Sequence, residues 1–372
     1  MHRAHRILLK PTVAQEIKLR KTVGVVRYTY NWAYDRWMQM YESGQSCDKY
    51  AISRMWTAER PEWSKEVYRL AQTRAILNLA DAFKKFFKKQ CKHPQHHKKG
   101  KHESFYVAND QRRIYADERR IMIPGVGHVK MTENFRFPDS KIMYYIVTHT
   151  PADQWYVTVV CMLPDKVVVP KSDDVIGIDI GFKDWAVASS GEVLTPPKRR
   201  LKRLYRKLAK RQRALARSAK ESKRRLRKRI AAARAYRRIT CIKQDIAHKF
   251  STMIANNHGT VVLEKLDIQS MQQAKSKSTR KGVHQSCAYA LSRMLEYKCS
   301  RAIRVSQFFP SSKTCSRCGE IGSSELTPDR KHKCTKCGLI IDRDMNAAIN
   351  LREEGLRIIS GGHPDNACGR SR

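Results

Sequence analysis

The sequence has few acidic residues and no long hydrophobic run, and both absences restrict what the protein can be. Its 372 residues include 34 Asp and Glu against 75 Lys and Arg, a formal net charge of +41. Charge repulsion of that size opposes a compact state unless a polyanion neutralises it, which predicts a nucleic-acid partner and argues against a small-molecule substrate. No run approaches the roughly 18 apolar residues of a transmembrane helix, so we expect no membrane partner. The apolar stretch Ile7–Leu9 is too short for a signal peptide, so we expect a soluble protein of the cytoplasm.

The cysteines do not have the pattern of a disulfide framework. Seven of the 11 are scattered singly, and the other four form two Cys-x2-Cys pairs, Cys315 with Cys318 and Cys334 with Cys337. Fifteen residues separate the two pairs, and a glycine follows each pair. Cysteine sulfurs at this spacing are typical ligands of a tetrahedral zinc ion, and four protein ligands leave no open coordination position. The sequence therefore predicts one structural Zn²⁺ ion and a reducing compartment.

The rest of the composition is that of a folded protein rather than a disordered basic tail. Hydrophobic residues make up 41%, and there are 6 Trp, 15 Tyr and 10 Phe. The pattern predicts a strand over 5–10 and then helical structure to about residue 89, with Thr12 and Gln15 as a capping box at its start. Two stripes in the helical part are expected to be packing core. They comprise Tyr30, Tyr34, Trp37 and Tyr41, and Leu77, Leu79, Ala80, Phe83, Phe86 and Phe87.

A histidine-rich loop and a β-rich segment follow. Cys91, His93, His96, His97 and His102 lack a regular ligand spacing, so a solvated or phosphate-contacting loop is favoured over a metal site. After Ser104 the hydrophobic period changes to two, which predicts a small β-domain that can also include the strand at 5–10. The expected strands cover 113–115, 120–123, 126–131, 142–149 and 155–162.

About half of the excess positive charge lies between Lys198 and Arg238. This segment has 21 Lys and Arg and a single acidic residue, Glu221. Two thin apolar stripes predict two helices with cations on every other face. Solvated helices normally interleave charges of both signs, so contact with a phosphate backbone is favoured over a plain solvated surface. The residues expected to make that contact are Lys202, Arg203, Arg206, Lys207, Lys210, Arg211, Arg224, Arg225 and Lys228.

Three acidic residues occupy unusual positions. Asp179 and Glu264 lie within apolar runs of β type, where an ionised carboxylate is costly unless it is compensated. Asp344 lies in the first turn of a predicted helix that follows the second cysteine pair. Taken singly, Asp344 could be a helix cap or a partner of the helix dipole, and Glu264 could be a salt-bridge partner. Taken together, the three can converge at one point of an α/β sheet, where carboxylates and phosphate oxygens would hold two catalytic Mg²⁺ ions, with Mn²⁺ as a possible replacement.

Four blocks of the sequence resemble the TnpB (OrfB) proteins of bacterial insertion sequences, which are relatives of the type V CRISPR effector nucleases. The blocks are Gly-Ile-Asp-Ile-Gly-Phe-Lys-Asp around Asp179, Val-Val-Leu-Glu-Lys-Leu around Glu264, Ser-Ser-Lys-Thr-Cys-Ser-Arg-Cys-Gly from Ser311, and Cys-Gly-Leu-Ile-Ile-Asp-Arg-Asp-Met-Asn-Ala-Ala-Ile-Asn from Cys337. One stretch departs from the family pattern. At 286–291, where relatives often carry Trp-x-x-Phe, this chain has Ser-Cys-Ala-Tyr-Ala-Leu.

The resemblance implies a fold of three parts. They are an α/β RuvC nuclease domain of RNase H-like fold that a zinc ribbon interrupts, a wedge β-barrel before it, and an α-helical recognition lobe inserted in that barrel. The implied boundaries are 1–10 for the first barrel strand, 11–103 for the helical lobe, 104–170 for the rest of the barrel, 171–312 for the nuclease domain with basic helices over 198–256, 313–340 for the zinc ribbon, 341–358 for the last part of the nuclease domain and 359–372 for a C-terminal tail.

The resemblance also implies a function. A guide RNA from the end of the mobile element would direct cleavage of matched double-stranded DNA beside a short adjacent motif, with Asp179, Glu264 and Asp344 as the catalytic, metal-binding acids. Arg343 or Lys313 is expected to contact the scissile phosphate. One protein per guide RNA is expected, and the oligomeric state stays open. The alternatives are a guided DNA-binding regulator that does not cleave, whose usual sign, the loss of an acid, is missing here, and a transposase that joins strands with the same acids.

Overall fold

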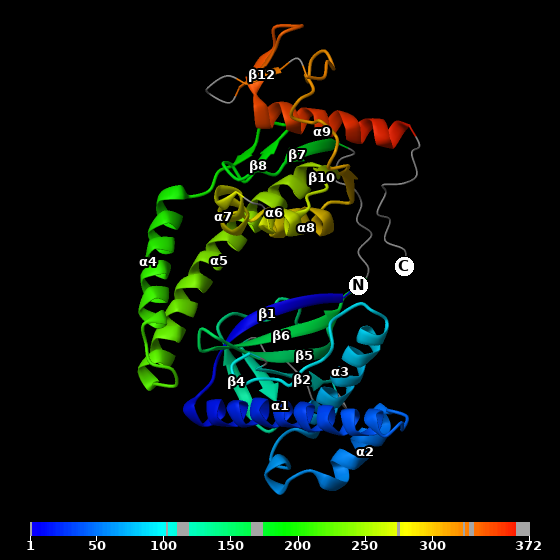
Figure 1. Ribbon diagram of the computed structural model, residues 1–372, viewed down its shortest axis with the longest axis vertical. Coiled ribbons are helices and arrows are strands. Elements are labelled where there is room, and N and C mark those ends of the chain that lie inside the picture. The colour runs from blue at the N-terminus through cyan, green and yellow to red at the C-terminus, as the bar shows by residue number, and fades with distance from the viewer. Residues whose placement is uncertain are drawn as a thin grey trace. The chain divides into compact units, whose positions relative to one another are not determined.

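The computed structural model describes residues 2–101, 103–109, 119–164, 174–273, 276–322, 324–326 and 331–361. The predicted strand over 113–115, His102 and the tail beyond residue 361 lie outside these ranges. The chain divides into two compact units, one of residues 1–166 and 218–234 and one of residues 167–217 and 235–372 (Figure 1). None of the helices within the described ranges is both long enough and apolar enough to span a bilayer.

The first unit contains a six-stranded antiparallel sheet with the strand order β2-β5-β6-β1-β4-β3 (Figure 1). Its strands are β1 (His2–Lys10), β2 (Ser104–Ala108), β3 (Arg120–Ile123), β4 (Gly127–Met131), β5 (Lys141–Thr150) and β6 (Gln154–Met162). β1 pairs along β6 and, at its end, with β4. The strand at the start of the chain therefore lies inside a sheet whose other strands follow the helices.

Apart from the start of α5 (Lys223–Asn257), the helices described in this unit lie between β1 and β2 in the chain. They are α1 (Val13–Glu42), α2 (Lys49–Glu59), a 3-10 helix (Glu62–Ser64) and α3 (Arg69–Phe87). The predicted capping box of α1 is confirmed, because Thr12 Oγ1 accepts from the N–H of Gln15 at 3.3 Å and Gln15 Oε1 accepts from the N–H of Thr12 at 3.0 Å. The start of α1 is thus fixed by the local sequence.

The two predicted stripes are buried only in part. Trp37 on α1 and Phe83 on α3 stack at 4.9 Å and are almost fully buried. One turn further along each helix, Tyr41 and Phe87 are 58% and 56% exposed. The prediction that these last two residues belong to the core was wrong, because a helical period does not show where neighbouring elements stop covering the helix.

The histidines of the loop after α3 pack against the protein. The ring of His97 stacks on Tyr30 at 3.6 Å, and His96 Nε2 lies 2.7 Å from Asp35 Oδ1. His93 meets two phenylalanine rings of α3 edge-on. Within the described ranges these side chains do not gather into a group that could hold a metal ion. The loop therefore contacts α1 and α3, while His93 and His96 stay exposed to solvent and His97 is half-buried. Contact of this loop with phosphate stays a prediction.

The second unit contains a five-stranded mixed sheet with the order β11-β10-β7-β8-β9. Its strands are β7 (Val175–Asp179), β8 (Ala186–Ala188), β9 (Val193–Leu194), β10 (Thr260–Glu264) and β11 (Arg301–Val305). β7, β8 and β9 are antiparallel, whereas β10 and β11 run parallel to β7. Because β7 and β10 are parallel neighbours, their carboxyl ends meet at one edge of the sheet.

The helices of the second half of the chain include the two predicted from the basic segment. They are α4 (Lys198–Ala216), α5 (Lys223–Asn257), α6 (Ile268–Gln273), α7 (Lys277–Gln285), α8 (Ala288–Lys298) and α9 (Arg343–Ser360). Leu201, Leu204 and Leu208 of α4 face the core, so a thin apolar seam carries the packing of this helix. At the stretch 286–291, Cys287 and Leu291 are buried in the same core, so the departure from the family pattern leaves this stretch packed.

Helix α9 lies directly against the backbone of the five-stranded sheet. A Cβ atom on Gly177 of β7 would lie 2.1 Å from the carbonyl oxygen of Ala348, and one on Gly355 would lie 2.3 Å from Val262 Cγ2. Only glycine allows this close approach at either position. The contact places the first turn of α9 at the carboxyl ends of β7 and β10.

Candidate functional site

The three acids predicted from the sequence line one pocket of the second unit. Asp179 ends β7, Glu264 ends β10, and Asp344 lies in the first turn of α9. The pocket has a volume of about 440 Å³. Its other lining residues are Gln307, Phe308, Phe309, Pro310, Ser311, Ser312, Lys313, Arg343 and Ala347. Among the described side chains only the four clustered cysteines have ligand atoms that all lie within 4.8 Å of one another, so the three carboxylates face one cavity without forming a closed cluster.

The electrostatics of the pocket disfavour its own negative charge. The pKa of Asp179 is raised to about 7, first by burial and then by the negative charges of Asp344 and Glu264, while Arg343 opposes the shift. Burial also raises the pKa of Glu264. Like charges that are crowded in a poorly solvated pocket raise the free energy of the ionised state, and a bound cation would lower it.

Asp344 is not the cap of α9, although it lies in the first turn, where a negative charge also suits the helix dipole. The carboxylate that caps α9 is that of Asp342, whose Oδ1 accepts from the N–H groups of Asp344 at 2.9 Å and Met345 at 3.1 Å. Arg304, on the neighbouring strand β11, pairs with Glu296 and donates to the main-chain oxygen of Glu264. Both acids therefore keep their carboxylates in the pocket.

The loop between β11 and the first cysteine pair forms one wall of this pocket. Its main-chain carbonyls are held by two asparagines that the sequence reasoning missed. Asn346 Nδ2 donates to the carbonyl of Thr314 at 2.7 Å, and Asn350 Nδ2 donates to that of Ser311 at 2.7 Å. The available signal was two polar residues four positions apart on the same face of α9 as its buried apolar residues.

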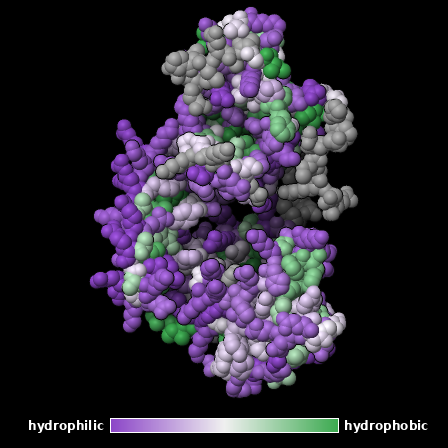
Figure 2. Space-filling view, in the orientation of Figure 1, coloured by the Kyte–Doolittle hydropathy of each residue, from purple (hydrophilic) through white to green (hydrophobic). Residues whose placement is uncertain are grey.

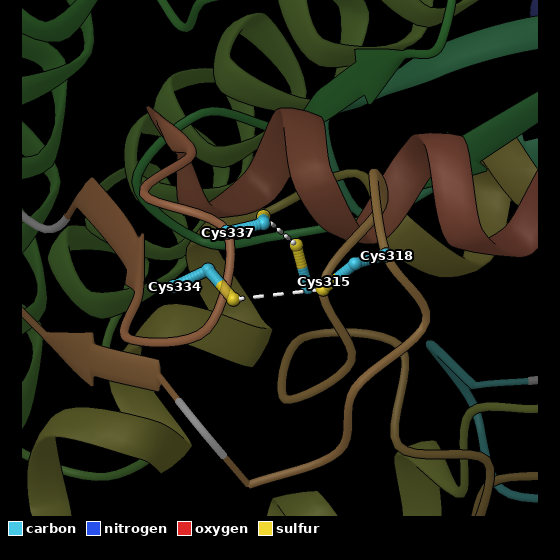
Figure 3. Close-up of side chains that lie close together, drawn as sticks. All are labelled: Cys315, Cys318, Cys334 and Cys337. Atoms are coloured by element: carbon cyan, nitrogen blue, oxygen red, sulfur yellow. Dashed lines mark hydrogen bonds between the residues drawn. The ribbon is translucent and has the colours of Figure 1, made fainter.

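The four predicted zinc ligands form a compact cluster (Figure 3). Cys315 Sγ lies 3.5 Å from Cys337 Sγ, and Cys318 Sγ lies 3.7 Å from Cys334 Sγ. These separations are too long for disulfide bonds and suit four ligands around one ion. The cluster lies beside a small antiparallel sheet of β12 (Ser324–Leu326), β13 (Lys331–Cys334) and β14 (Ile340–Asp342).

The glycine after each cysteine pair has a structural reason. Gly319 and Gly338 adopt φ angles of +73° and +72°, which L side chains rarely adopt. Their N–H groups donate to the carbonyls of Cys315 at 2.9 Å and Cys334 at 3.0 Å. Each pair is therefore closed by a tight turn that brings its two sulfurs to the same side.

The nine residues predicted to contact nucleic acid differ in the solvent exposure of their side chains. Six are exposed, and hydrophilic surface dominates the region over α4 and the start of α5 (Figure 2). These six are Lys202, Arg203, Arg206, Lys207, Lys210 and Arg224. Arg211, Arg225 and Lys228 are half-buried. Arg225 Nη1 donates to the carbonyl of Ser218 at 2.8 Å, and Lys228 Nζ lies 2.9 Å from Ser218 Oγ, so these two cations hold the turn before α5.

A solved structure shares this fold. The cryo-EM structure of a Cas12f1–sgRNA–target DNA complex aligns with a TM-score of 0.56 at 15% sequence identity and covers 91% of this chain and 82% of that chain. The chain therefore has a fold similar to that of the Cas12f1 protein in this complex.

Sequence comparisons find family models that match three parts of the chain and relatives that match almost all of it. The family model OrfB_IS605, described as "Probable transposase", matches residues 158–275, the TNB domain of Cas12f1-like proteins matches 289–351, and a helix-turn-helix domain of the OrfB_IS605 group matches 1–46. A Streptomyces pristinaespiralis protein named "Putative RNA-guided DNA endonuclease" is 29% identical over 95% of this chain and 89% of its own length. A similarly named Escherichia coli K12 protein is 26% identical over 98% of this chain and 94% of its own length. These matches support a TnpB-type protein.

Proposed function

We propose that this protein is an RNA-guided, Mg²⁺-dependent DNA endonuclease of a bacterial mobile element. The observation that carries the proposal is the convergence of Asp179, Glu264 and Asp344 in one pocket, although they are far apart in the sequence. Relatives that match almost the whole chain bear the name of RNA-guided DNA endonucleases. The guide RNA would come from the end of the element, and the target would be matched double-stranded DNA beside a short adjacent motif.

The donor set of the pocket fits divalent cations. Three carboxylates with the serine hydroxyls and main-chain carbonyls of the adjoining loop are oxygen ligands of the kind that Mg²⁺ and Mn²⁺ prefer. The raised pKa of Asp179 reflects burial first and then the negative charges of Asp344 and Glu264, which the charge of Arg343 opposes. Two bound ions would activate a water molecule and stabilise the leaving oxygen of the phosphodiester.

The protein residues around the carboxylates position the substrate in this proposal. Asp179, Glu264 and Asp344 hold the ions. Lys313 and Arg343 line the same pocket and supply positive charge for the phosphate that reacts. Arg343 is oriented by its contact with Ser312 Oγ, at 3.3 Å.

We assign the two units to the domains that the resemblance to TnpB proteins implies. The sheet order β11-β10-β7-β8-β9, with three antiparallel and two parallel strands, supports a RuvC domain of RNase H-like fold. The six-stranded sheet supports a wedge β-barrel, into which residues 11–103 insert the helical recognition lobe. The cysteine segment between β11 and α9 then corresponds to the zinc ribbon that interrupts the nuclease domain.

The cysteine cluster would hold one Zn²⁺ ion with a structural role, because four thiolates leave no coordination site for substrate. Elemental analysis of the purified protein tests this assignment. We expect one zinc per chain in the native protein and in Cys241→Ser, which changes an exposed cysteine of α5. We expect the zinc to be lost in the double variant Cys315→Ser, Cys318→Ser. Retention of a full equivalent of zinc by the double variant would refute the assignment.

The nuclease proposal is tested by purifying the protein with its flanking DNA expressed, sequencing the nucleic acid that it retains, and offering it a matched duplex. We expect a retained RNA from one end of the element and Mg²⁺-dependent cleavage. Asp179→Ala should abolish cleavage and leave duplex binding nearly intact, since it removes a metal ligand and no phosphate contact. Cleavage by that variant would contradict the proposal.

A transposase is the second candidate, because the matching family model carries that description. The two functions differ in their need for RNA. Treatment with RNase before addition of DNA should abolish guided cleavage, whereas strand joining at the ends of the element would continue. Joined products after RNase treatment would favour the transposase.

A further inference from the structure

A second cavity lies in the first unit and belongs to neither the carboxylate pocket nor the cysteine cluster. Its volume is about 530 Å³. The lining residues are Lys18, Lys21, Thr22, Gly24 and Val25 of α1, Trp63, Glu66 and Val67 of the segment between α2 and α3, and Gly125 of the turn between β3 and β4. An indole and two valines supply apolar surface, and two lysines supply positive charge.

Trp63 is held in place although its side chain is half exposed. It belongs to the 3-10 helix Glu62–Ser64, and its ring packs edge-on against Tyr28, with the ring centres 5.0 Å apart. The next residue, Ser64, is fully buried, and its main-chain carbonyl accepts from Gln72 Nε2 at 2.9 Å. An exposed indole on a fixed backbone is a preformed surface for stacking, because little conformational freedom is lost when a ligand binds.

Gly24 keeps one side of the cavity unfilled, although the packing of α1 does not require a glycine there. It lies in the interior of α1, where glycine is the least favourable residue after proline. A Cβ atom built there would have no neighbour within 4 Å, so close packing does not require glycine at this position. Glycine instead leaves the floor of the cavity free.

The charged residues that line the cavity indicate which kind of ligand it can bind. The exposed Lys18 and Lys21 suit an anionic group. The net charge of the chain, +41, likewise favours a polyanionic partner. Glu66 lies beside them, with Oε2 2.8 Å from Lys21 Nζ, and a carboxylate there would repel a ligand that offers only phosphate. It would accept a hydrogen bond from a hydroxyl group, and a ribose 2′-OH supplies one that deoxyribose lacks.

We propose that this cavity binds one unpaired nucleotide of an RNA, with the base on Trp63, the phosphate at Lys18 or Lys21 and the ribose hydroxyl at Glu66. The proposal deepens the proposed function, since it rests on RNA as a partner and adds a protein site for a single flipped or unpaired base. It requires no catalytic step.

The test uses the full-length protein and a short single-stranded RNA that carries one 2-aminopurine, together with a DNA of the same sequence. Fluorescence anisotropy of an end label measures total binding, and 2-aminopurine emission measures stacking. With RNA we expect emission to be quenched on binding. Trp63→Ala and Gly24→Leu should weaken the quenching titration roughly 5- to 100-fold, while anisotropy still reports binding through the basic helices.

Three controls make the result specific. Trp63→Phe keeps a stacking surface and should retain most of the quenching. Gly24→Ala adds one methyl group where nothing is within 4 Å and should act far more weakly than Gly24→Leu. Tyr50→Ala removes another exposed aromatic ring beside a lysine, since Lys49 Nζ lies 4.9 Å from its ring centre, but Tyr50 does not line this cavity and its loss should have no effect.

Two results would overturn the proposal. One is unchanged quenching of the RNA probe in Trp63→Ala and Gly24→Leu. The other is equal quenching of the DNA probe, which would assign the cavity to DNA. Because the probe assay needs no cleavage, its failure would leave the nuclease proposal in place. Conversely, if the protein failed the cleavage assay, it could still show quenching that is specific to the RNA probe.

Discussion

The side chain of Asn346 bonds the helix that carries Asp344 to the segment that leads into the cysteine cluster, through the carbonyl of Thr314. The Nδ2–oxygen distance is 2.7 Å, and the Oδ1 atom of the same asparagine accepts from the N–H of Ser316 at 2.9 Å. Asn346 is fully buried. The cysteine cluster and the candidate active site are thus joined by the hydrogen bonds of one buried side chain, and loss of order at one should reach the other.

Replacement of Asn346 with alanine should destabilise this junction. It removes the acceptor of the Ser316 N–H and one of two amide donors to the carbonyl of Thr314, at a cost of about 1–3 kcal/mol. The other donor, Asn350 Nδ2, still lies 2.7 Å from that carbonyl. We expect faster amide hydrogen exchange over 311–316 and the first turn of α9, a lower melting temperature and weaker cleavage. Asn257→Ala, at the exposed last residue of α5, is the matched control and should change none of these. Unchanged exchange in Asn346→Ala would show that the junction is not held by this side chain.

The exposed and the engaged cations of the basic segment should behave differently. Lys207 is exposed on α4, whereas Lys228 lies against Ser218 in the turn before α5. Lys207→Gln should reduce the slope of log K against log salt for RNA binding by roughly 0.7–0.9 if it contacts one phosphate. Lys228→Gln should chiefly lower the stability of the turn, measured by hydrogen exchange over 217–228. Equal salt slopes for native protein and Lys207→Gln would remove Lys207 from the contact surface.

Local patterns predicted the parts of this structure that depend on neighbours in the sequence. The capping box at Thr12 follows from a three-residue spacing, and the turns at Gly319 and Gly338 follow from cysteine pairs closed by glycine. The carboxylates of Asp179 and Glu264 were conspicuous because each sits in an apolar strand, where only a compensating partner makes a charge tolerable.

Features that depend on distant segments could not be predicted in this way. The stacking of His97 on Tyr30 and the bond from Asn350 to Ser311 join residues that are 67 and 39 positions apart. Nothing in either local sequence specifies the partner. The cavity beside Trp63 likewise forms from three separate segments, so a sequence pattern in any one of them carries no sign of it.

Phe308 should position the nucleic-acid strand at the carboxylate pocket. Its side chain lines the pocket yet is 84% exposed, and the loop that carries it is fixed by Asn350. A base stacked on this ring would place its phosphate near the acids. Phe308→Ala should lower cleavage roughly 5- to 100-fold, with little change in the RNA retained.

Phe308→Trp and Tyr289→Ala provide the comparison for that experiment. The tryptophan keeps a stacking surface and should restore most of the activity. Tyr289, 61% exposed on α8, does not line the pocket, and its alanine variant should cleave normally. Equal loss of activity in Phe308→Ala and Phe308→Trp would show that stacking is not the role of this ring.

Asp179→Asn should make the metal-free protein more stable while removing its response to metal. Because the pKa of Asp179 is raised to about 7 in the folded state, above its ordinary value of 3.8, the ionised carboxylate destabilises the fold. Stability is therefore lost as the pH rises from about 4 towards 7, and above pH 7 the penalty is on the order of 2–4 kcal/mol. In a chelator at pH 8 the variant should melt several degrees higher than the native protein.

Addition of Mg²⁺ distinguishes the loss of the Asp179 carboxylate from the loss of an exposed carboxylate on the surface. The native protein should gain stability from the ion, because binding to the folded state alone shifts the folding equilibrium, and Asp179→Asn should gain much less. Asp245→Asn removes an exposed carboxylate of α5 that pairs with Lys249, a contact of small energy. It should match the native protein with and without Mg²⁺. A lower melting temperature for Asp179→Asn than for the native protein in the chelator would show that the ionised Asp179 carboxylate does not destabilise the metal-free fold.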